Sequence, residues 1–197
     1  MRLFHLPGSR STRALWALEE IGEPFDLRIL TREEKVSEEH ARRHPLGRVP
    51  VLELDDGQSM FESAAICLYL GDLFPESGML PPTGTYERAL TYQWSVFAMS
   101  ELEPATYNWM RARRAETDET ELAEKFQTIS GALEASLKDR TWLAGEEFTV
   151  ADILCASILS SAIRRDFVPE SNATLHSYFS RAQERPANVR AEAVRTD

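Results

Sequence analysis

The sequence is poor in the residues that build metal sites and disulfides. Its 197 residues include only two cysteines and four histidines. Cys67 and Cys155 lie far apart, each within an apolar segment, and no Cys-x-x-Cys is present. His40 and His44 are spaced like metal ligands on a helix, but charged residues surround them. The pattern favours buried, reduced thiols and predicts no metal site.

Long apolar runs and basic clusters are also missing. The longest stretch without a charged side chain, Ala89 to Ser100, has twelve residues, whereas a membrane-spanning helix needs about 20. The apolar run at the N-terminus is too short for a signal peptide. The net charge is −10, and neither the first 80 residues nor the remainder has an excess of Lys and Arg. We therefore expect a cytoplasmic protein that binds neither membranes nor nucleic acid.

The composition itself is that of a globular protein. Hydrophobic residues make up 43% of the chain and charged residues 27%. These values are typical of a folded domain and unlike those of a disordered acidic chain. The length allows one large domain or two small ones.

The N-terminal segment predicts a β-α-β unit. Residues 2–6 form a short apolar run that ends at Pro7-Gly8, and residues 11–21 then show helical apolar spacing. Residues 25–30 alternate with period two, as a strand does. A right-handed crossover between the two strands would make them parallel.

The pattern continues with a hairpin and a helix. Residues 31–44 are charged and poorly periodic, which predicts a short exposed helix or a loop. The turn signal Asp55-Asp56-Gly57 separates two strand-like runs, at 49–54 and around 59–61. Helical spacing then covers residues 63–74.

Beyond residue 75 the character of the sequence changes. Prolines and glycines are dense from 75 to 86, which predicts a linker. No convincing strand follows, and the expected helices cover 86–114, with a break near Pro104, 119–138, 149–164 and 171–184. The predicted architecture is α/β plus all-α: a domain at 1–78, a linker at 79–85 and an all-helical domain at 86–197.

Six motifs in order resemble those of the cytosolic glutathione transferase family. They are Pro7-Gly8-Ser9-Arg10-Ser11-Thr12-Arg13, Pro45-Leu46-Gly47-Arg48-Val49-Pro50-Val51-Leu52, Phe61-Glu62-Ser63-Ala64-Ala65-Ile66, Gln93-Trp94, Trp142-Leu143-Ala144-Gly145 and Thr149-Val150-Ala151-Asp152. The resemblance covers nearly the whole chain. It implies a thioredoxin-like, glutathione-binding βαβαββα domain, an all-helical second domain and a cytoplasmic homodimer.

The first motif carries the candidate catalytic group. A thiol held at a helix N-terminus ionises more easily, because the helix dipole and a hydrogen bond both favour the thiolate. From the residues alone, Ser9 or Ser11 could simply be an N-cap. The resemblance to serine-type bacterial members, aligned through Arg13-Ala14, implies that Ser9 stabilises the glutathione thiolate, with Ser11 as the alternative. Some bacterial members have cysteine where this chain has Arg10, which argues against a mechanism on a protein thiol.

Two further motifs imply contacts with glutathione. The resemblance implies a cis bond between Val49 and Pro50, with the Val49 backbone binding the cysteinyl part like an added strand. Ser63 stands where a helix begins, which is a site for anions. In the family, the pair that matches Glu62-Ser63 holds the γ-glutamyl end.

Positively charged side chains are the remaining glutathione candidates. Arg10 could contact a glutathione carboxylate or add to the positive field around the sulfur, and Arg48 could approach the glycine carboxylate. A solvated surface arginine is the alternative for Arg10. His40 is a weaker candidate.

The helical half offers less specific signals. Leu90, Trp94 and Phe97 form a stripe that is more typical of a core than of a pocket. The resemblance implies that this helix lines the co-substrate site, with Phe97, Glu101 and Trp109 as candidates.

Another helical motif has a structural interpretation. Thr149 and Asp152 match a capping box at a helix start, so we expect a structural role for this carboxylate.

The residues and the resemblance together predict a glutathione transferase. It would stabilise the glutathione thiolate for attack on a hydrophobic electrophile. A glutathione-dependent disulfide reductase of the same fold is an alternative, with a small disulfide as co-substrate. A non-enzymatic binding protein of this fold is another alternative. The presence of Ser9, Val49-Pro50 and Glu62-Ser63 together argues against a site that has lost its function.

Overall fold

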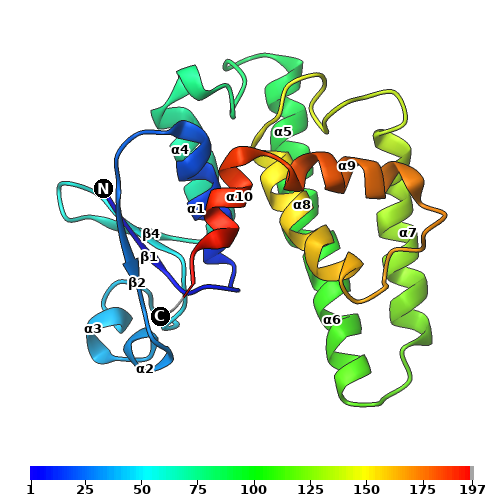
Figure 1. Cartoon of the computed structure of the whole chain (residues 1–197), viewed down its shortest axis with the longest axis horizontal. Coiled ribbons are helices and arrows are strands. Elements are labelled where there is room, and N and C mark those ends of the chain that lie inside the picture. The colour runs from blue at the N-terminus through cyan, green and yellow to red at the C-terminus, as the bar shows by residue number, and fades with distance from the viewer. Residues whose placement is uncertain (196–197) are drawn as a thin grey trace. The chain divides into compact units, whose positions relative to one another are not determined.

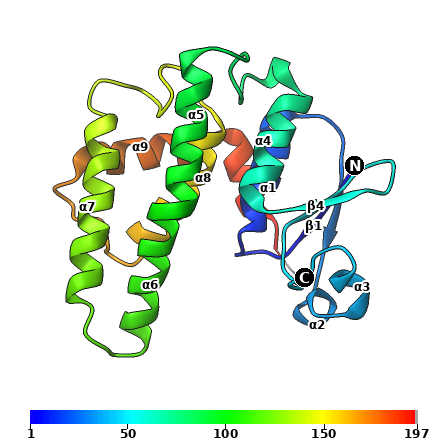
Figure 2. The ribbon, with the colours of Figure 1, turned by 180° about the vertical axis from the view of Figure 1, so that it is seen from behind.

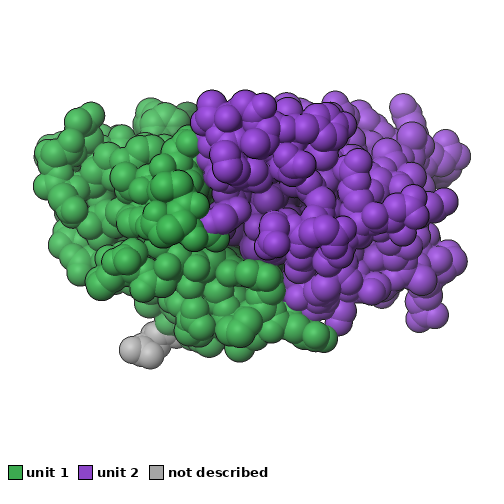
Figure 3. Space-filling view, turned by 90° about the horizontal axis from the view of Figure 1, so that it is seen from above, with its two compact units in different colours: residues 1–77, 184–197 green, residues 78–183 purple. Residues whose placement is uncertain are grey.

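The computed structural model describes residues 1–195, which form two compact units. Among the described residues, unit 1 contains 1–77 and 184–195, and unit 2 contains 78–183 (Figure 3). The predicted helical domain extended to residue 197, so the assignment of the terminal segment to unit 1 differs from the expectation. The physical reason is a helix near the C-terminus that packs against the first helix of the chain.

Unit 1 is built on a four-stranded mixed sheet. The strands are β1 (Arg2–His5), β2 (Asp26–Ile29), β3 (Val51–Glu53) and β4 (Ser59–Phe61), in the order β2-β1-β3-β4. β1 and β2 are parallel, whereas β3 runs antiparallel to both of its neighbours. The predicted β-α-β unit and hairpin are therefore both confirmed.

Helix α1 (Ser11–Ile21) is the centre of unit 1. It packs against β1, α4 (Ser63–Leu73) and α10 (Pro186–Ala193), as Figures 1 and 2 show from opposite sides. Contacts on several sides explain why the whole run from Arg13 to Leu18 is buried. The helix ends at Gly22, whose φ of 78° allows its N–H to bond the Leu18 carbonyl.

Strand β1 separates two small cores because its side chains alternate between faces. Leu3 and His5 point to one side, and Phe4 points to the other, where it packs with Leu30 and Val51. Residues 31–44, which we expected to form a short exposed helix or a loop, form two short α-helices, α2 (Arg32–Lys35) and α3 (Glu38–Ala41).

Unit 2 is helical. Its elements are α5 (Tyr86–Phe97), the π-helical turn η2 (Ala98–Leu102), α6 (Glu103–Arg114), α7 (Thr120–Ser136), α8 (Val150–Ile163) and α9 (Ala173–Gln183). The wide turn η2 stands where a break was expected. Pro104 has no N–H to donate, so the helix continues through a wider turn just before it.

The start of α8 is fixed by a buried carboxylate. Asp152 is fully buried and accepts hydrogen bonds from the Leu143 N–H, the Thr149 N–H and the Tyr178 hydroxyl at 2.9–3.0 Å. The Thr149 hydroxyl donates to it as well, at 3.1 Å. The predicted capping box is thus present. Within residues 1–195, no helix is both long and apolar enough to cross a bilayer.

Candidate active site

The strand register brings the predicted site segments to one edge of the sheet. Phe4 of β1 pairs with Val51 of β3, and Val51 pairs with Phe61 of β4. β1 therefore ends where β3 begins and β4 ends, because β3 is antiparallel to both. The turn after β1, the residues before Val51 and Glu62 after Phe61 consequently lie next to one another.

The loop before β3 presents backbone groups at this edge. The Val49–Pro50 bond is cis, as predicted. Neither the N–H nor the C=O of Val49 bonds to another backbone group within the described part of the chain. Arg48 is exposed, and its carbonyl accepts a 2.8 Å hydrogen bond from Nε2 of His40. Because His40 is 1% exposed, it braces this loop from inside rather than facing a ligand.

The start of α4 carries the second predicted motif. Glu62 is exposed and has φ 73°, a left-handed backbone that is uncommon for a residue other than glycine. Ser63, the first residue of α4, is 3% exposed. Its hydroxyl accepts a 3.4 Å hydrogen bond from the Arg13 guanidinium, which joins the starts of α1 and α4.

The turn between β1 and α1 contains two serines with different environments. Ser9 is half-buried, whereas Ser11 is fully buried at the first position of α1. Their hydroxyl oxygens lie 2.7 Å apart, and the Ser9 oxygen also accepts the Ser11 N–H at 3.2 Å. Arg10, at the N-cap position, is exposed and gives no side-chain cap. Of the two hydroxyls, Ser9 is therefore the one that a ligand can reach.

Sequence reasoning missed two buried polar residues behind this turn. His5 is 1% exposed, and its Nδ1 lies 2.8 Å from the Ser11 hydroxyl. Burial lowers the pKa of His5 to about 4, so the imidazole is neutral near pH 7. Arg13 is 5% exposed in the first turn of α1, next to the buried apolar residues that follow it. A histidine and an arginine among buried apolar positions were the available signals.

The cysteines offer no reactive thiol to this site. Cys67 and Cys155 are both free and fully buried. Burial raises the pKa of Cys67 to about 12, which keeps the thiol protonated. Among residues 1–195, no group of three or more His, Cys, Asp or Glu side chains could hold a metal ion.

The predicted co-substrate residues lie in unit 2, in different environments. Trp109 is 6% exposed, and its ring stacks on Phe167 at 3.9 Å between centroids. This packing favours a structural role for Trp109. Phe97 is half-buried against Trp94, and Glu101 is exposed in the π-helical turn.

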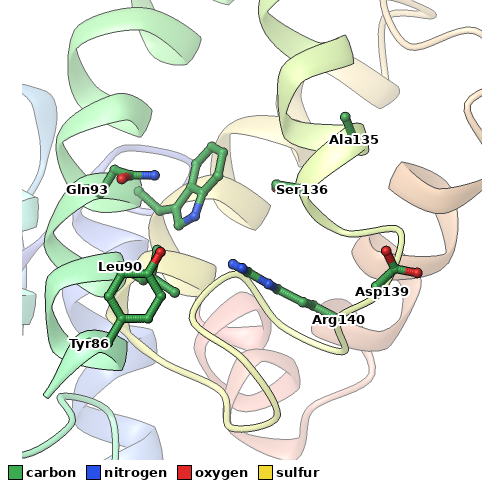
Figure 4. Close-up of a pocket in the computed structure, with 8 residues that line it drawn as sticks. Tyr86, Leu90, Gln93, Ala135, Ser136, Asp139 and Arg140 are labelled. Atoms are coloured by element: carbon green, nitrogen blue, oxygen red, sulfur yellow. The ribbon is translucent and has the colours of Figure 1, made fainter.

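A pocket of about 390 Å³ in unit 2 lies between α5 and the end of α7. Figure 4 shows Arg140 reaching from beyond α7 toward α5, where Tyr86 and Gln93 lie. None of the three predicted co-substrate residues lines it. The lining residues are Tyr86, Leu90, Gln93, Trp94, Ala135, Ser136, Asp139 and Arg140.

Comparison with known proteins places the chain in a family. The model for the glutathione S-transferase N-terminal domain matches residues 3–78, and the model for the C-terminal domain matches residues 90–186. Glutathione S-transferase GstA from Escherichia coli O157:H7 is 30% identical over 193 residues, which cover 94% of both chains. The chain belongs to the glutathione S-transferase family.

Two further relatives of this glutathione S-transferase bear on its function. The structure of a sphingomonad glutathione S-transferase complexed with glutathione is similar with a TM-score of 0.84 and 29% identity, covering 98% of this chain and 97% of the other. Elongation factor 1-gamma-A from Xenopus laevis is 34% identical over 122 residues, which cover 58% of this chain and 26% of that protein.

Proposed function

We propose that this family member is a glutathione transferase of the serine type, with Ser9 as the donor to the glutathione thiolate. The observation that carries the proposal is the half-buried Ser9 hydroxyl at the sheet edge where Val49 and Glu62 also lie. A thiolate there would accept a hydrogen bond from Ser9 and face the N-terminus of α1. Both interactions favour the charged sulfur and so lower its pKa.

The rest of the glutathione molecule follows the same edge. The Val49 backbone binds the cysteinyl part as an added strand does. Ser63, with the N–H groups at the start of α4, takes the γ-glutamyl carboxylate, and Glu62 takes the ammonium group. Arg48 and Arg10 are exposed cations and are the candidates for binding the remaining carboxylate. Such local groups are needed because the net charge of −10 opposes an anionic tripeptide.

The reaction then needs no further protein nucleophile. Glutathione loses its thiol proton to solvent, and the thiolate attacks the electrophilic carbon of a hydrophobic co-substrate. A carbon–sulfur bond forms as the leaving group departs with its electron pair. The protein contributes a larger thiolate fraction and proximity. Phe97 and Glu101 are the candidates that remain accessible for the co-substrate side. We expect a cytoplasmic homodimer, as the family resemblance implies.

Titration of the bound thiol tests this assignment. The thiolate absorbance of glutathione bound to the protein gives the thiol pKa for the wild type and for Ser9→Ala. We expect Ser9→Ala to raise this pKa by about one unit, because a hydrogen bond to a charged group is lost. Ser130→Ala is the matched control, since Ser130 is fully buried and bonds the Gln127 carbonyl of its own helix. An unchanged pKa in Ser9→Ala contradicts the assignment.

A disulfide reductase is the second enzymatic candidate. Both cysteines are buried, so glutathione would have to supply both electrons: one thiolate attacks the disulfide and a second glutathione resolves the mixed disulfide. Turnover on an aryl halide and on a small mixed disulfide separates the two activities.

A binding function without catalysis is favoured by a different observation. Part of the chain is similar to elongation factor 1-gamma-A, whose name does not describe an enzyme. Retention on immobilised glutathione distinguishes the cases, because failure to bind at millimolar concentration would favour a non-enzymatic role.

A further inference from the structure

A chain of three hydrogen-bonding side chains runs inward from Ser9. The Ser9 and Ser11 oxygens are 2.7 Å apart, and the Ser11 oxygen is 2.8 Å from Nδ1 of His5. Ser9 is half-buried, whereas Ser11 and His5 are 0% and 1% exposed. The outer hydroxyl is therefore connected to a neutral imidazole that solvent does not reach.

The Ser11 hydroxyl can form hydrogen bonds with both Ser9 and His5 in only two ways. A hydroxyl has one proton and two acceptor positions. The Leu6 N–H occupies one acceptor position at 3.0 Å. If the Ser11 proton went to the Leu6 carbonyl at 3.2 Å, Ser9 and His5 would both have to donate to the single position left. The proton therefore goes either to Ser9 or to His5, and the other group donates to Ser11.

The two arrangements have opposite consequences for a ligand. If Ser11 donates to His5, then Ser9 donates inward to Ser11 and presents an oxygen lone pair outward, which repels a thiolate. If His5 donates through Nδ1–H, then Ser11 donates to Ser9. The Ser9 oxygen already accepts the Ser11 N–H at 3.2 Å, so its own proton is left to point outward.

The surroundings of His5 select between these arrangements. Its Nε2 is buried and has no hydrogen-bond partner among the described residues. An unpaired buried N–H is rarer in native proteins than an under-used acceptor. A neutral imidazole carries one ring proton, and placing it on Nδ1 leaves Nε2 as the acceptor. This tautomer gives the outward-pointing Ser9 proton.

We propose that His5 and Ser11 are positioning residues, which orient the Ser9 proton toward the sulfur of glutathione. We call the hydrogen bonds from His5 through Ser11 to Ser9 the relay. The relay deepens the proposed function and rests on it, since it acts only through Ser9. His5 itself neither touches glutathione nor exchanges a proton with it; it fixes the direction of two hydrogen bonds. The direction is set before the ligand arrives, so no reorientation is needed when the thiolate forms.

A double-mutant cycle on the pKa of the bound thiol tests the relay. We expect His5→Leu and Ser11→Ala each to raise this pKa by about 0.5 to 1 unit in the wild-type background. In the Ser9→Ala background the same substitutions should shift it by less than about 0.2 unit, because nothing is left to orient. Equal shifts in both backgrounds, or no shift in the wild type, overturn the relay.

Conservative and control variants separate orientation from folding. His5→Asn retains an amide N–H near the position of Nδ1 and should recover at least half of the shift caused by His5→Leu. Ser130→Ala should leave the thiol pKa unchanged. Where His5→Leu fails to fold, the cycle of Ser11→Ala with Ser9→Ala carries the test, and a loss of thermal stability alone does not produce a background-dependent shift.

Nitrogen NMR of the imidazole provides a readout that does not depend on glutathione. In protein labelled with ¹⁵N-histidine, we expect the His5 proton on Nδ1. A proton on Nε2 overturns the relay. It does not decide the role of Ser9, which the thiol titration of Ser9→Ala tests separately. Conversely, an unchanged thiol pKa in Ser9→Ala refutes the proposed function even where His5 is the Nδ1–H tautomer.

Discussion

Helices α1 and α8 both begin at a buried polar group, but the two groups differ in how completely they are paired. At α8, Asp152 accepts four hydrogen bonds, from two N–H groups and two hydroxyls. At α1, the series of hydrogen bonds from His5 to Ser9 ends at a half-buried hydroxyl on one side and, on the other, at an Nε2 atom with no partner among residues 1–195. A fully paired group stabilises the fold, whereas a series of hydrogen bonds that ends at an accessible hydroxyl can form one further hydrogen bond to a ligand.

The largest expected effect is on stability at α8. Asp152→Ala leaves four donors without an acceptor, two of them backbone N–H groups, so the free energy of unfolding should fall by about 3 to 5 kcal/mol. Urea unfolding monitored by circular dichroism measures it. Ser9→Ala is the counterpart at α1 and should cost less than about 1 kcal/mol, since the Ser9 side chain is partly solvated. Comparable losses of unfolding free energy in Asp152→Ala and Ser9→Ala would contradict the proposed difference between the starts of the two helices.

The two groups should also respond to pH in opposite directions. Burial lowers the pKa of His5 from 6.5 to about 4, so the unfolded chain binds the proton first and stability falls as pH drops from 6.5 toward 4. Burial raises the pKa of Asp152 from 3.8 to about 6, so the folded protein binds the proton first and stability rises as pH drops from 6 toward 3.8. Each contribution is at most on the order of 3 kcal/mol.

Variants separate these opposing contributions. Between pH 6.5 and 4.5, urea midpoints of His5→Leu should fall less than those of the wild type, and midpoints of Asp152→Asn should fall more. Parallel pH profiles for all three proteins would show that neither group differs in pKa between the folded and unfolded states.

The smallest expected effect concerns the far end of α1. Arg185 makes two hydrogen bonds to the Glu20 carboxylate, at 2.6 and 2.7 Å, and the Glu20 side chain is 11% exposed. Glu20→Gln should lower the free energy of unfolding by about 1 kcal/mol. Glu19→Gln, which breaks the more exposed pair with Arg190, is the matched control and should change it by less than about 0.5 kcal/mol. Equal losses would mean that burial does not distinguish the pairs.

Much of this fold could be predicted because its signals are local. The alternation of residues 25–30, the turn at Asp55-Asp56-Gly57 and the helical spacing of 63–74 each specified an element that the structure contains. Periodicity could not place the terminal segment. The contact between α10 and α1 joins residues more than 160 positions apart, as the two ion pairs between these segments show, and such contacts leave no local pattern.

In the candidate site, too, some residues could be predicted from local motifs and others could not. The motifs around Ser9, Val49 and Glu62 could be recognised, and the register places them at one edge. His5 could not be assigned, because strand alternation predicts which face it occupies but not that its ring meets Ser11. Trp109 was a candidate for the co-substrate side since aromatic residues serve both pockets and cores, and only its stacking on Phe167 distinguishes the two.

The attachment of α10 to α1 also sets an order of events during synthesis. Unit 2 is one continuous stretch, residues 78–183, and can form its contacts once that stretch has left the ribosome. Unit 1 needs residues 186–193, whose buried Ala187 and Ala191 come from the helix that packs on α1. The segment translated first is therefore completed last, and until then the surface of α1 that α10 covers is available to chaperones.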